Sequence, residues 1–245
     1  MNRLQLISKY CLMALLSLSL FALNPTAWAQ DDDDDFFVFD EDEEDVQEIA
    51  DPLEGFNRAM FSINDKLYRG VLKPVARGLR ILPEPVRNSG ANFFNNLGTP
   101  ISALNALLQF DLPNAGTELS RFVINTTIGL LGLFDPATDL GIAEDNEDLG
   151  QTLAHYGVGH GFYVVVPFLG PSSMRDGFGM LGDAFVNPVY DNLSTVEVVG
   201  ANVLEAEIDL SLDQDTYEAF YESALDPYIF FRSAYVQNRA GRVEE

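Results

Sequence analysis

The sequence predicts a mainly α-helical fold with little or no sheet. Five times along the chain, a residue that can cap a helix N-terminus stands directly before proline. The cap's side-chain oxygen accepts a hydrogen bond from a free backbone N–H, and proline at the first helical position removes no donor that the helix needs. Runs of alternating apolar and polar residues, which would indicate half-buried strands, are few. The five pairs are Asp51-Pro52, Thr99-Pro100, Asp135-Pro136, Asn187-Pro188 and Asp226-Pro227.

The chain opens with two positive residues and an apolar run over 12–23. About 12 apolar residues are too few to span a bilayer, which takes about 20. Small residues in Ala27-Trp28-Ala29 stand where a signal peptidase reads them. Residues 1–29 are therefore predicted to be a signal peptide. The only cysteine, Cys11, precedes the apolar run, so the exported chain is predicted to have neither a thiol nor an acylated N-terminal cysteine.

Residues 30–50 are predicted to be an acidic, disordered tail. They carry 12 acids and no base, and like charges at this density repel each other and keep a chain extended. Phe36-Phe37-Val38-Phe39 interrupts the tract and fits either a short docking motif or a solvated tail. Removing these 12 acids and the two bases of the signal segment from the whole chain's 38 and 14 leaves 26 acids and 12 bases, a net charge of −14. That charge disfavours nucleic acid as a partner, and contact with lipid would have to be apolar.

The stretch 66–82 is predicted to be an amphipathic helix at a membrane interface. A cationic stripe backed by an apolar face suits that position, although an ordinary surface helix packed on a core is the alternative. The clustering of bases between Arg58 and Arg87 favours the interface. Pro74 is expected to kink or split the helix. The basic side comprises Lys66, Arg69, Lys73, Arg77 and Arg80, and the opposite side comprises Leu67, Val71, Leu72, Val75, Leu79 and Leu82.

Two further segments, 100–110 and 122–134, are apolar nearly all round. A helix without a polar face is either buried in protein or immersed in lipid. The second run is too short to cross a membrane alone, although it could enter one leaflet, and Gly129 and Gly132 would allow close backbone approach. A buried core helix is the favoured interpretation.

Residues 155–171 have a different pattern. Gly157, Gly159 and Gly161 alternate before Val164-Val165-Val166, which predicts an irregular loop followed by a short extended segment. The spacing fits neither a dinucleotide fingerprint nor a phosphate-binding loop. The segment could line a passage or form a structural turn.

The sequence offers little chemistry for catalysis or metal binding. His155 and His160 are five residues apart rather than four, and no cysteine supports them, so no zinc site is predicted. The motifs HExxH and GxSxG and the Walker motif are absent from the sequence. A hydrolase using His160, Ser172 and Asp176 is the enzymatic alternative, but closeness in sequence does not establish a triad. No catalytic residue, metal or cofactor is therefore predicted.

A series of motifs follows in order from residue 51 to about residue 238. The series is Asp51-Pro52-Leu53-Glu54-Gly55-Phe56-Asn57-Arg58, Leu72-Lys73-Pro74-Val75-Ala76, Asn92-Phe93-Phe94-Asn95-Asn96-Leu97, Arg121-Phe122 with Asn125-Thr126, Glu147-Asp148-Leu149-Gly150-Gln151-Thr152-Leu153, His155-Tyr156-Gly157-Val158-Gly159, Pro167-Phe168-Leu169-Gly170-Pro171-Ser172-Ser173, Arg175-Asp176 and Asp226-Pro227-Tyr228. In this order they resemble the MlaA family, also called VacJ. The opening octet and the block 147–159 are the most specific.

The resemblance implies one ring-like helical domain over 51–240, followed by a short tail over 241–245. It implies a non-enzymatic phospholipid-transfer channel at the inner leaflet of the outer membrane, on its periplasmic face. Such a channel removes misplaced phospholipid from the outer leaflet beside a trimeric porin. It then passes the lipid to a periplasmic carrier protein, which maintains lipid asymmetry.

Within that expectation, the region 155–176 is predicted to line the hole in the ring. Its glycines would make room, and its polar groups would meet lipid headgroups. By the same analogy, a turn at Ser62-Ile63-Asn64-Asp65 that ends the first helix is predicted to influence how open the channel is. The predicted lining residues are Gly157, Gly159, His160, Gly161, Ser172 and Arg175.

The signal segment departs from the family, whose typical members are lipoproteins. Retention at the membrane would then depend on apolar helices and any porin partner, or the protein would be peripheral. Two competing functions stay open. One is a porin-associated envelope scaffold without transport activity, and the other is a lipid hydrolase that uses His160.

Overall fold

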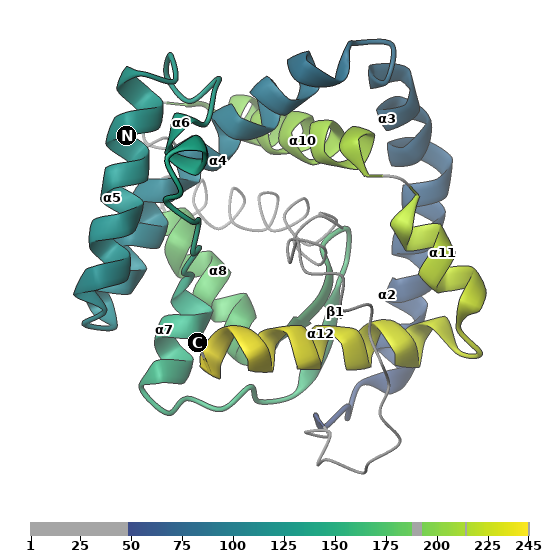
Figure 1. Ribbon diagram of the computed structural model, residues 1–245. Helices are drawn as coiled ribbons and strands as arrows, with labels where there is room; N and C mark the ends of the chain where they lie inside the picture. The colour runs from purple at the N-terminus through teal and green to yellow at the C-terminus, as the bar shows by residue number, and fades with distance from the viewer. Residues whose placement is uncertain (1–48, 188–192, 214, 245) are drawn as a thin grey trace.

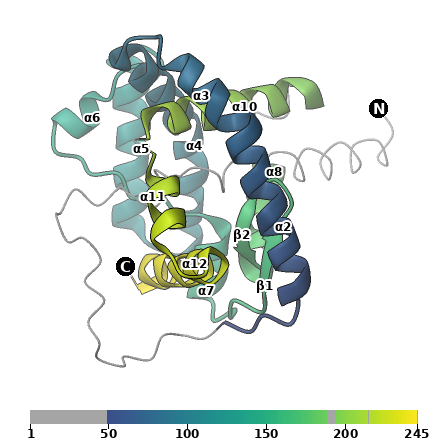
Figure 2. The same ribbon diagram turned by 90° about the vertical axis from the view of Figure 1, so that its right-hand side faces the viewer.

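The computed structural model describes residues 49–187, 193–213 and 215–244. The predicted signal peptide and nearly all of the predicted acidic tail lie outside these residues. The described chain is mainly helical with one two-stranded sheet, and its helices form a ring (Figure 1), which confirms the predicted fold class. Seen edge-on, α2 and the sheet lie toward one edge of the ring, and α11 and α12 lie toward the other (Figure 2).

The helices follow the ring in Figure 1 with α4 and α10 at the top, α2, α3 and α11 on the right and α5 on the left. α12 closes the ring below, from α11 toward α7. The elements are α2 (Glu54–Leu67), the π-helical turn η2 (Tyr68–Leu72), α3 (Lys73–Leu79), α4 (Glu84–Leu108), α5 (Leu112–Thr127), α6 (Pro136–Asp139), α7 (Leu149–His155), β1 (Tyr163–Val166), β2 (Gly170–Ser173), α8 (Met174–Val186), α10 (Thr195–Leu212), α11 (Thr216–Ser223) and α12 (Pro227–Glu244).

Two of the five predicted helix starts are confirmed. Asp135 caps α6 by accepting a hydrogen bond from the backbone N of Thr138 at 3.1 Å. α12 begins at Pro227, and Asp226 accepts from the backbone N of Tyr228 at 3.1 Å. The pair Asn187-Pro188 is described only as far as Asn187, which directly follows the last residue of α8.

The other two starts are wrong. α4 continues straight through Thr99-Pro100, and the Thr99 hydroxyl donates to the Asn95 carbonyl within the helix. One helical hydrogen bond lost at a proline is tolerated where neighbouring elements hold the helix, and α4 packs along α5 and α10. α2 begins at Glu54 rather than at Pro52, because the Asp51 carboxylate makes tertiary contacts instead of a cap.

The apolar run 122–134 is not a buried helix. α5 ends at Thr127, and residues 128–134 form an irregular loop with exposed leucines. The run 100–110 forms the last turns of α4 rather than a separate helix. The sequence pattern did not show where the helix ends, and beyond that end Leu130 and Leu131 adopt positive φ, which apolar composition does not indicate.

The basic stretch splits as predicted near Pro74. The π-helical turn η2 precedes it, and Pro74 lies in the first turn of α3. By contrast, the predicted turn at Ser62-Ile63-Asn64-Asp65 is wrong, since these residues lie inside α2. The predicted tail at 241–245 is also wrong as far as residue 244, because α12 continues to Glu244.

Two asparagine amides on the same side of α2 hold the short sheet against this helix. Asn57 accepts from the backbone N of Val165 at 2.8 Å and donates to the Tyr163 carbonyl at 3.1 Å. Asn64 accepts from the backbone N of Phe168 at 2.7 Å and donates to the Val166 carbonyl at 3.0 Å. These bonds satisfy the free edge of β1, whose other edge pairs antiparallel with β2. The predicted extended segment at 164–166 is therefore confirmed.

Candidate functional site

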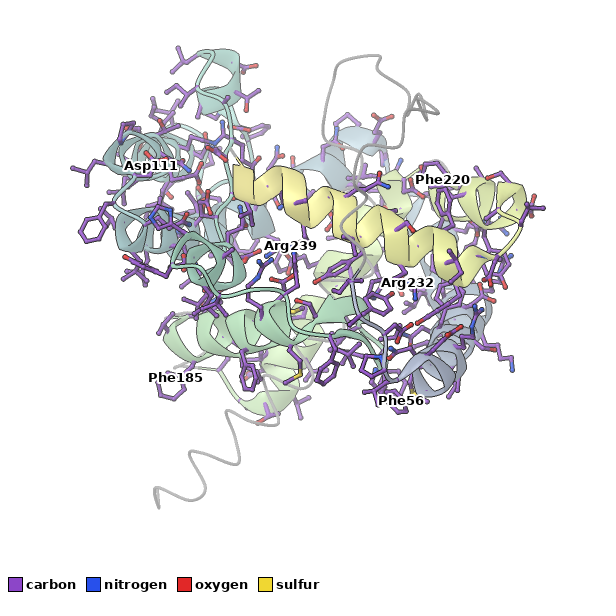
Figure 3. The ribbon with its side chains drawn as sticks, turned by 90° about the horizontal axis from the view of Figure 1, so that it is seen from below. Phe56, Asp111, Phe185, Phe220, Arg232 and Arg239 are labelled. Carbon is purple, nitrogen blue, oxygen red and sulfur yellow. The ribbon has the colours of Figure 1, made fainter. Side chains whose placement is uncertain are left out.

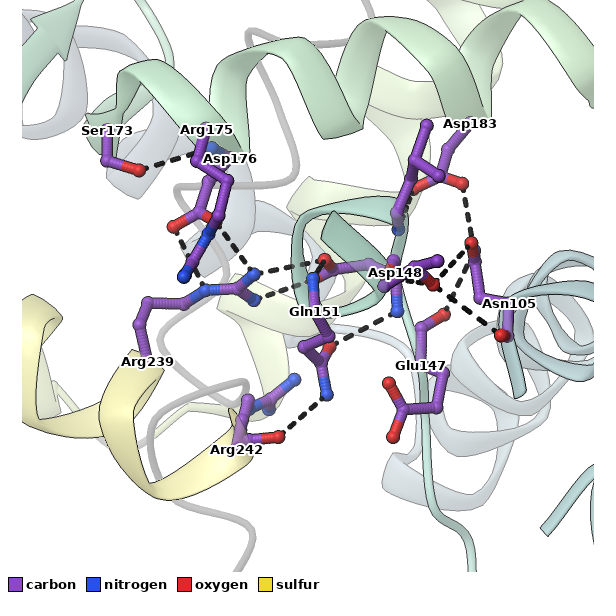
Figure 4. A network of polar contacts seen from close by, with 12 residues as sticks. Asn105, Glu147, Asp148, Gln151, Ser173, Arg175, Asp176, Asp183, Arg239 and Arg242 are labelled. Carbon is purple, nitrogen blue, oxygen red and sulfur yellow. Dashed lines mark hydrogen bonds and ion pairs between the residues drawn. The ribbon is translucent and has the colours of Figure 1, made fainter. Parts of the chain in front are cut away.

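The most highly connected polar cluster joins α7, α8 and α12 (Figure 4). Arg239 of α12 forms a bidentate pair with Asp148, the N-cap of α7, at 2.6 and 3.0 Å. It also donates to both carboxylate oxygens of Asp176 at 3.1 Å. Asp176 further accepts from Arg175 at 2.8 Å and from the Tyr235 hydroxyl. One arginine thus fastens the end of the closing helix to two others.

The charges of this cluster are fixed by its pairing. Burial disfavours the Asp176 carboxylate, but the nearby Arg239 and the bonds from Arg175 and Tyr235 lower its pKa to about 2. The pKa of Asp148 is lowered in the same way, against burial, by Arg239. Both aspartates are therefore ionised at neutral pH, and the cluster is an ion-pair network with no proton to exchange.

α7 and α8 approach each other closely beside this cluster. A Cβ atom at Gly179 would lie 2.4 Å from the backbone N of Gly150, and one at Gly150 would lie 2.6 Å from an Asp176 carboxylate oxygen. Asp183 accepts from the backbone N of Leu149 at 2.9 Å and from the Asn105 amide at 2.9 Å. The two glycines are thus required for the packing that brings Asp148 and Asp176 to one guanidinium.

A second polar junction ties the start of the domain to the other end of α12. Asp51 accepts from the Asn57 amide at 2.7 Å, from Arg232 at 3.1 Å and from the Tyr228 hydroxyl. The Arg58 guanidinium pairs with Asp226 at 2.9 Å and lies 4.4 Å from the centre of the Tyr228 ring. α12 is therefore pinned at both ends by charged groups.

The structure separates the predicted lining residues into two sets. Gly157, Gly159 and Gly161 lie on an exposed loop before β1, with positive φ at Gly157 and Gly161. Ser172 and Arg175 are buried, with exposed fractions of 2% and 5%, so they do not lie on an open surface. In this conformation they are covered, and the prediction that they line a hole beside the glycines stays a prediction that requires the loop to move. Their position follows from β2 and the first turn of α8 packing beneath the loop.

His160 connects the two sets and is half-buried. Its carbonyl accepts from the backbone N of Arg175 at 3.2 Å. The His160 Nδ1 and the Arg175 Nη2 are both buried and lack a hydrogen-bond partner within the described residues. Burial and the positive charge of Arg175 lower the pKa of His160, so its ring is neutral at pH 7. Buried polar atoms without partners are costly, which makes this pair a candidate contact for a polar ligand group.

The geometry gives no support to the hydrolase alternative. Within the described residues, no hydrogen bond joins His160 to Ser172 or Asp176. The Asp176 carboxylate is held by Arg239, Arg175 and Tyr235 instead of by a histidine. The Ser172 hydroxyl donates to the Ser173 carbonyl at 3.4 Å. A search of the same residues finds no group of three His, Cys, Asp or Glu side chains placed to hold a metal ion.

The predicted cationic stripe faces protein over part of its length. Lys73 is buried and pairs with Glu218 and with Asp215, and Leu72 packs in the core beside it. Arg80 donates to the carbonyls of Ser211 and Asp213 at the C-terminal end of α10, where a cation complements the helix dipole.

The membrane-interface prediction is therefore wrong for Leu72 and Lys73, because the acidic start of α11 covers them. Arg80 is engaged with α10 as well. Lys66 and Arg77 are exposed and Leu79 is half-buried, and for these three an interface position stays a prediction.

The distribution of side chains differs from that of an ordinary soluble domain. Among the described residues, the buried ones include 23 polar or charged residues and 16 apolar ones, whereas large apolar side chains are exposed on most helices. Soluble domains more often bury large apolar side chains and keep polar ones at the surface. Figure 3 shows two of the exposed apolar side chains, Phe56 of α2 and Phe185 of α8, which project from one edge of the ring, whereas Arg239 points between helices. None of the described helices is both long and apolar enough to cross a membrane.

The sequence profile of the MlaA lipoprotein family matches residues 49–242. The chain belongs to the MlaA family. It is 37% identical over 201 residues to the intermembrane phospholipid transport system lipoprotein MlaA of Escherichia coli K12, covering 79% of this chain and 78% of that protein. It is 33% identical over 210 residues to the protein of that name from Haemophilus influenzae, covering 83% of each chain.

A solved structure described as the structural basis for maintenance of bacterial outer membrane lipid asymmetry is also similar to this chain. The TM-score is 0.72 at 36% sequence identity, over 79% of this chain and 99% of that chain. An uncharacterised protein of Rickettsia bellii is 33% identical over 208 residues, covering 81% of this chain and 78% of that protein.

The motifs that resemble the MlaA family carry the two junctions of α12. The opening octet supplies Asp51, Asn57 and Arg58, and the block at 147–153 supplies Asp148 and the Gln151 of its capping box. Sequence reasoning missed Arg239 and Tyr235, which complete the network from α12. A lone arginine in a predicted terminal helix gives no sequence signal of a buried ion pair, because its partners are 63 and 91 positions away.

Proposed function

We propose that this chain is a non-enzymatic phospholipid-transfer channel at the inner leaflet of the outer membrane. In this role it removes misplaced phospholipid from the outer leaflet and hands it to a periplasmic carrier, which maintains lipid asymmetry. Two relatives named as components of an intermembrane phospholipid transport system support the proposal. The observation that carries it is the distribution of side chains: polar residues outnumber apolar ones among the buried residues, and large apolar side chains are exposed on most helices.

The physical reason lies in the structure of the substrate. A phospholipid headgroup cannot enter hydrocarbon without losing its hydrogen bonds, at a cost of several kcal/mol for each unpaired polar group. A ring of helices with polar groups inside offers a path for the headgroup, while apolar outer faces stay in contact with acyl chains. In this account the ring sits in one leaflet, which requires no helix long enough to span the bilayer.

Within this proposal, the exposed glycine loop Gly157–Gly161 borders the lipid path. Gly159 has open space around the position of a Cβ atom and no positive φ. The unpartnered Nδ1 of His160, a residue of this loop, and Nη2 of Arg175, which follows β2, are the proposed contacts for a headgroup oxygen. Reaching Arg175 would require the loop to move, because its side chain is covered in this conformation.

The proposed partners are phospholipid, a trimeric porin beside the ring and a periplasmic lipid-carrier protein. Lys66 and Arg77, which are exposed on α2 and α3, are the basic groups available to lipid phosphates at the interface. Without the signal segment the chain carries 38 acids and 12 bases, a net charge of −26, so it would gain little from general attraction to anionic lipid. Attachment to the membrane is therefore expected to depend mainly on apolar surface.

The test is the lipid content of the protein purified in mild detergent from membranes of its own cells. The proposal predicts about one or more intact phospholipids per chain by mass spectrometry. A Gly159→Trp variant, which adds bulk at an exposed position, is expected to fold normally but to retain less phospholipid. Gly200→Trp is the matched control, because Gly200 also has open space around its Cβ position.

The same preparation distinguishes the two competing functions. A porin-associated scaffold would copurify with the porin but carry no more phospholipid than any membrane protein of equal apolar surface. A hydrolase would release lysophospholipid or fatty acid on incubation, and a His160→Ala variant would lose that release. Either result would contradict the proposed function.

A further inference from the structure

The loop that follows α5, residues 128–134, is unusually apolar for a surface segment and is called the apolar loop below. Leu130 and Leu131 have exposed fractions of 60% and 66%, and Ile128, Leu133 and Phe134 are also exposed. No charged residue occurs from 122 to 134. Surface loops are ordinarily polar and solvated, so the composition of this loop indicates that something other than water covers it.

Most backbone N–H groups of the apolar loop are paired within the loop or with the end of α5. The N–H groups of Leu131, Gly132 and Phe134 donate to the carbonyls of Thr126, Asn125 and Gly129 at 2.8 to 2.9 Å. Those of Ile128 and Gly129 both reach the Ile124 carbonyl, at 2.8 and 3.2 Å. A loop in water needs no such pairing, whereas a loop in hydrocarbon does, because each unpaired group there costs several kcal/mol in general.

The internal pairing is achieved with strained backbone. Leu130 and Leu131 adopt φ of +54° and +65°, followed by Gly132 at +88°. The left-handed region disfavours leucine and suits glycine or asparagine better. Leucine at both positions is therefore not explained by the backbone, and what the two side chains have in common is that they point outward into the surroundings.

The loop rests on a rigid polar base. Asp135, directly after the loop, accepts from Arg121 at 2.9 Å and from the Asn125 amide at 2.8 Å. A Cβ atom at Gly132 would lie 2.5 Å from the Asn96 side chain, so the loop is seated closely on α4. The apolar loop is thus preformed rather than a segment that would need to order on binding.

The outer face of α5 continues this surface, on the outside of the ring in Figure 1. It exposes Leu112, Leu119 and Val123, while its two charged residues, Glu118 and Arg121, are buried on the opposite face. Exposed hydroxyl groups on the same helix donate to its own carbonyls, from Ser120 to Gly116 at 2.7 Å and from Thr127 to Val123 at 2.6 Å. Such back-bonding leaves no hydroxyl hydrogen that needs water.

We propose that the apolar loop inserts into the hydrocarbon of a phospholipid leaflet, with the outer face of α5 lying at the interface behind it. The choice of lipid over a protein partner rests on charge. A surface without charge and with few free donors matches an uncharged liquid phase, whereas protein interfaces use hydrogen bonds and polar rims. It is also the region where a strongly acidic chain can approach an anionic membrane without repulsion. The inference rests on the proposed function only for the presence of a membrane.

The test is sedimentation of the purified chain without its predicted signal peptide with vesicles of phosphatidylethanolamine and phosphatidylglycerol. In a Leu130→Asn/Leu131→Asn variant, binding should fall roughly 30-fold, from the loss of two partly exposed leucines worth about 1 kcal/mol each in transfer. Thermal stability should be unchanged or higher, because asparagine suits positive φ. Leu225→Asn, at a fully exposed leucine between α11 and α12, is the matched control and should bind like the parent.

A second measurement reports how deeply the apolar loop enters the hydrocarbon of the bilayer. The only tryptophan, Trp28, lies in the predicted signal peptide, so a Phe134→Trp variant of the chain without that peptide carries a single reporter in the loop. Lipids brominated on their acyl chains should quench it several-fold more than the reporter in a Leu225→Trp variant of the same chain. Equal quenching at the two sites, or parental vesicle binding by the asparagine variant, would overturn the proposal. An asparagine variant that binds vesicles normally but loses a copurifying outer-membrane protein would assign the loop to a protein partner instead. Vesicle binding is measured without lipid transport. A failure of the loop proposal is therefore distinguishable from a failure of the proposed transfer function.

Discussion

Arg239 near the end of α12 forms a bidentate ion pair with Asp148, which stands 91 positions earlier at the start of α7, with Nη1 2.6 Å from Oδ2 and Nη2 3.0 Å from Oδ1. The same guanidinium also contacts Asp176 of α8. Since α12 closes the ring of helices in Figure 1, this contact joins the last helix of the chain to its middle. The ring is therefore completed by buried charge pairing rather than by apolar packing alone.

Replacing Arg239 by methionine should destabilise the fold strongly. The change leaves Asp148 and Asp176 buried without a cation, and loss of one partner from a buried ion pair costs about 3–5 kcal/mol. Denaturant unfolding of the detergent-solubilised protein measures the effect. Arg77→Met removes an exposed arginine, 3.9 Å from Asp215, and should change the free energy of unfolding by less than about 0.5 kcal/mol. Equal effects of the two substitutions would mean that the Arg239 network does not hold the ring closed.

Glu118 of α5 should make stability depend on pH in the direction opposite to an ion-paired carboxylate. It is fully buried, its Oε2 lacks a partner among the described residues, and burial raises its pKa to about 7. Because the folded chain holds this proton more tightly than the unfolded chain, where glutamate titrates near pH 4.3, the free energy of unfolding falls as pH rises from about 4.5 to about 7.

A Glu118→Gln variant removes this contribution and keeps the acceptor for the backbone N of Asp145. At pH 8 it should be more stable than the parent by on the order of 1–3 kcal/mol, and the two stability curves should meet below about pH 5. Glu222→Gln, at an exposed glutamate on α11, should leave the whole curve unchanged. A Glu118→Gln curve parallel to that of the parent from pH 5 to 8 would show that this carboxyl group does not change protonation there.

Asn57 should be one of the most sensitive positions outside the ion-pair network. Its buried amide bonds Asp51, the Tyr163 carbonyl and the Val165 backbone N. Asn57→Leu leaves these groups unpaired, and each buried unsatisfied group costs about 1–3 kcal/mol. The expected loss is about 2–5 kcal/mol, with increased hydrogen exchange at Val165 as the local readout. Asn95→Leu, at an exposed position of α4, serves as the control, and a loss at Asn57 no larger than at Asn95 would contradict this assignment.

Two glycine-to-alanine substitutions should have opposite signs. Gly179→Ala places a Cβ atom 2.4 Å from the backbone N of Gly150 and must push α7 and α8 apart, at a cost of about 1–3 kcal/mol. Gly200→Ala, inside α10 with open space around it, should stabilise by about 0.5–1 kcal/mol because alanine restricts the unfolded chain. Thermal unfolding of both variants checks the pair, and tolerance of Gly179→Ala would show that α7 and α8 are less closely packed.

Much of the fold could be predicted from local sequence signals, whereas little of the ion-pair network around Arg239 could be predicted in this way. The caps at Asp135 and Asp226 and the valine strand depend on neighbouring residues, so the sequence shows them directly. Asp51 looks like a helix cap but bonds Arg232, and Lys73 looks like part of an exposed stripe but pairs with Glu218. In both cases the partner comes from the last quarter of the chain, which no local pattern reports.

The same limit applies to the predicted site, where only the features that depend on local sequence could be predicted. The glycines at 157, 159 and 161 indicated an irregular loop correctly, because conformational freedom is a local property. The burial of Ser172 and Arg175 depends on how β2 and α8 pack. The apolar run 122–134 was expected to be a buried helix, since nothing in its composition separates a core from a surface that faces hydrocarbon.

The most direct measurement is the amount of phospholipid in the outer leaflet of the outer membrane of cells that lack this chain. Surface labelling of aminophospholipid in intact cells gives this amount, with the parent strain and a complemented strain as references. The account predicts a several-fold increase in the deletion strain that the intact chain reverses and that the Arg239→Met chain does not. Outer-leaflet phospholipid that stays at the parental level in the deletion strain would contradict the proposed role in lipid asymmetry.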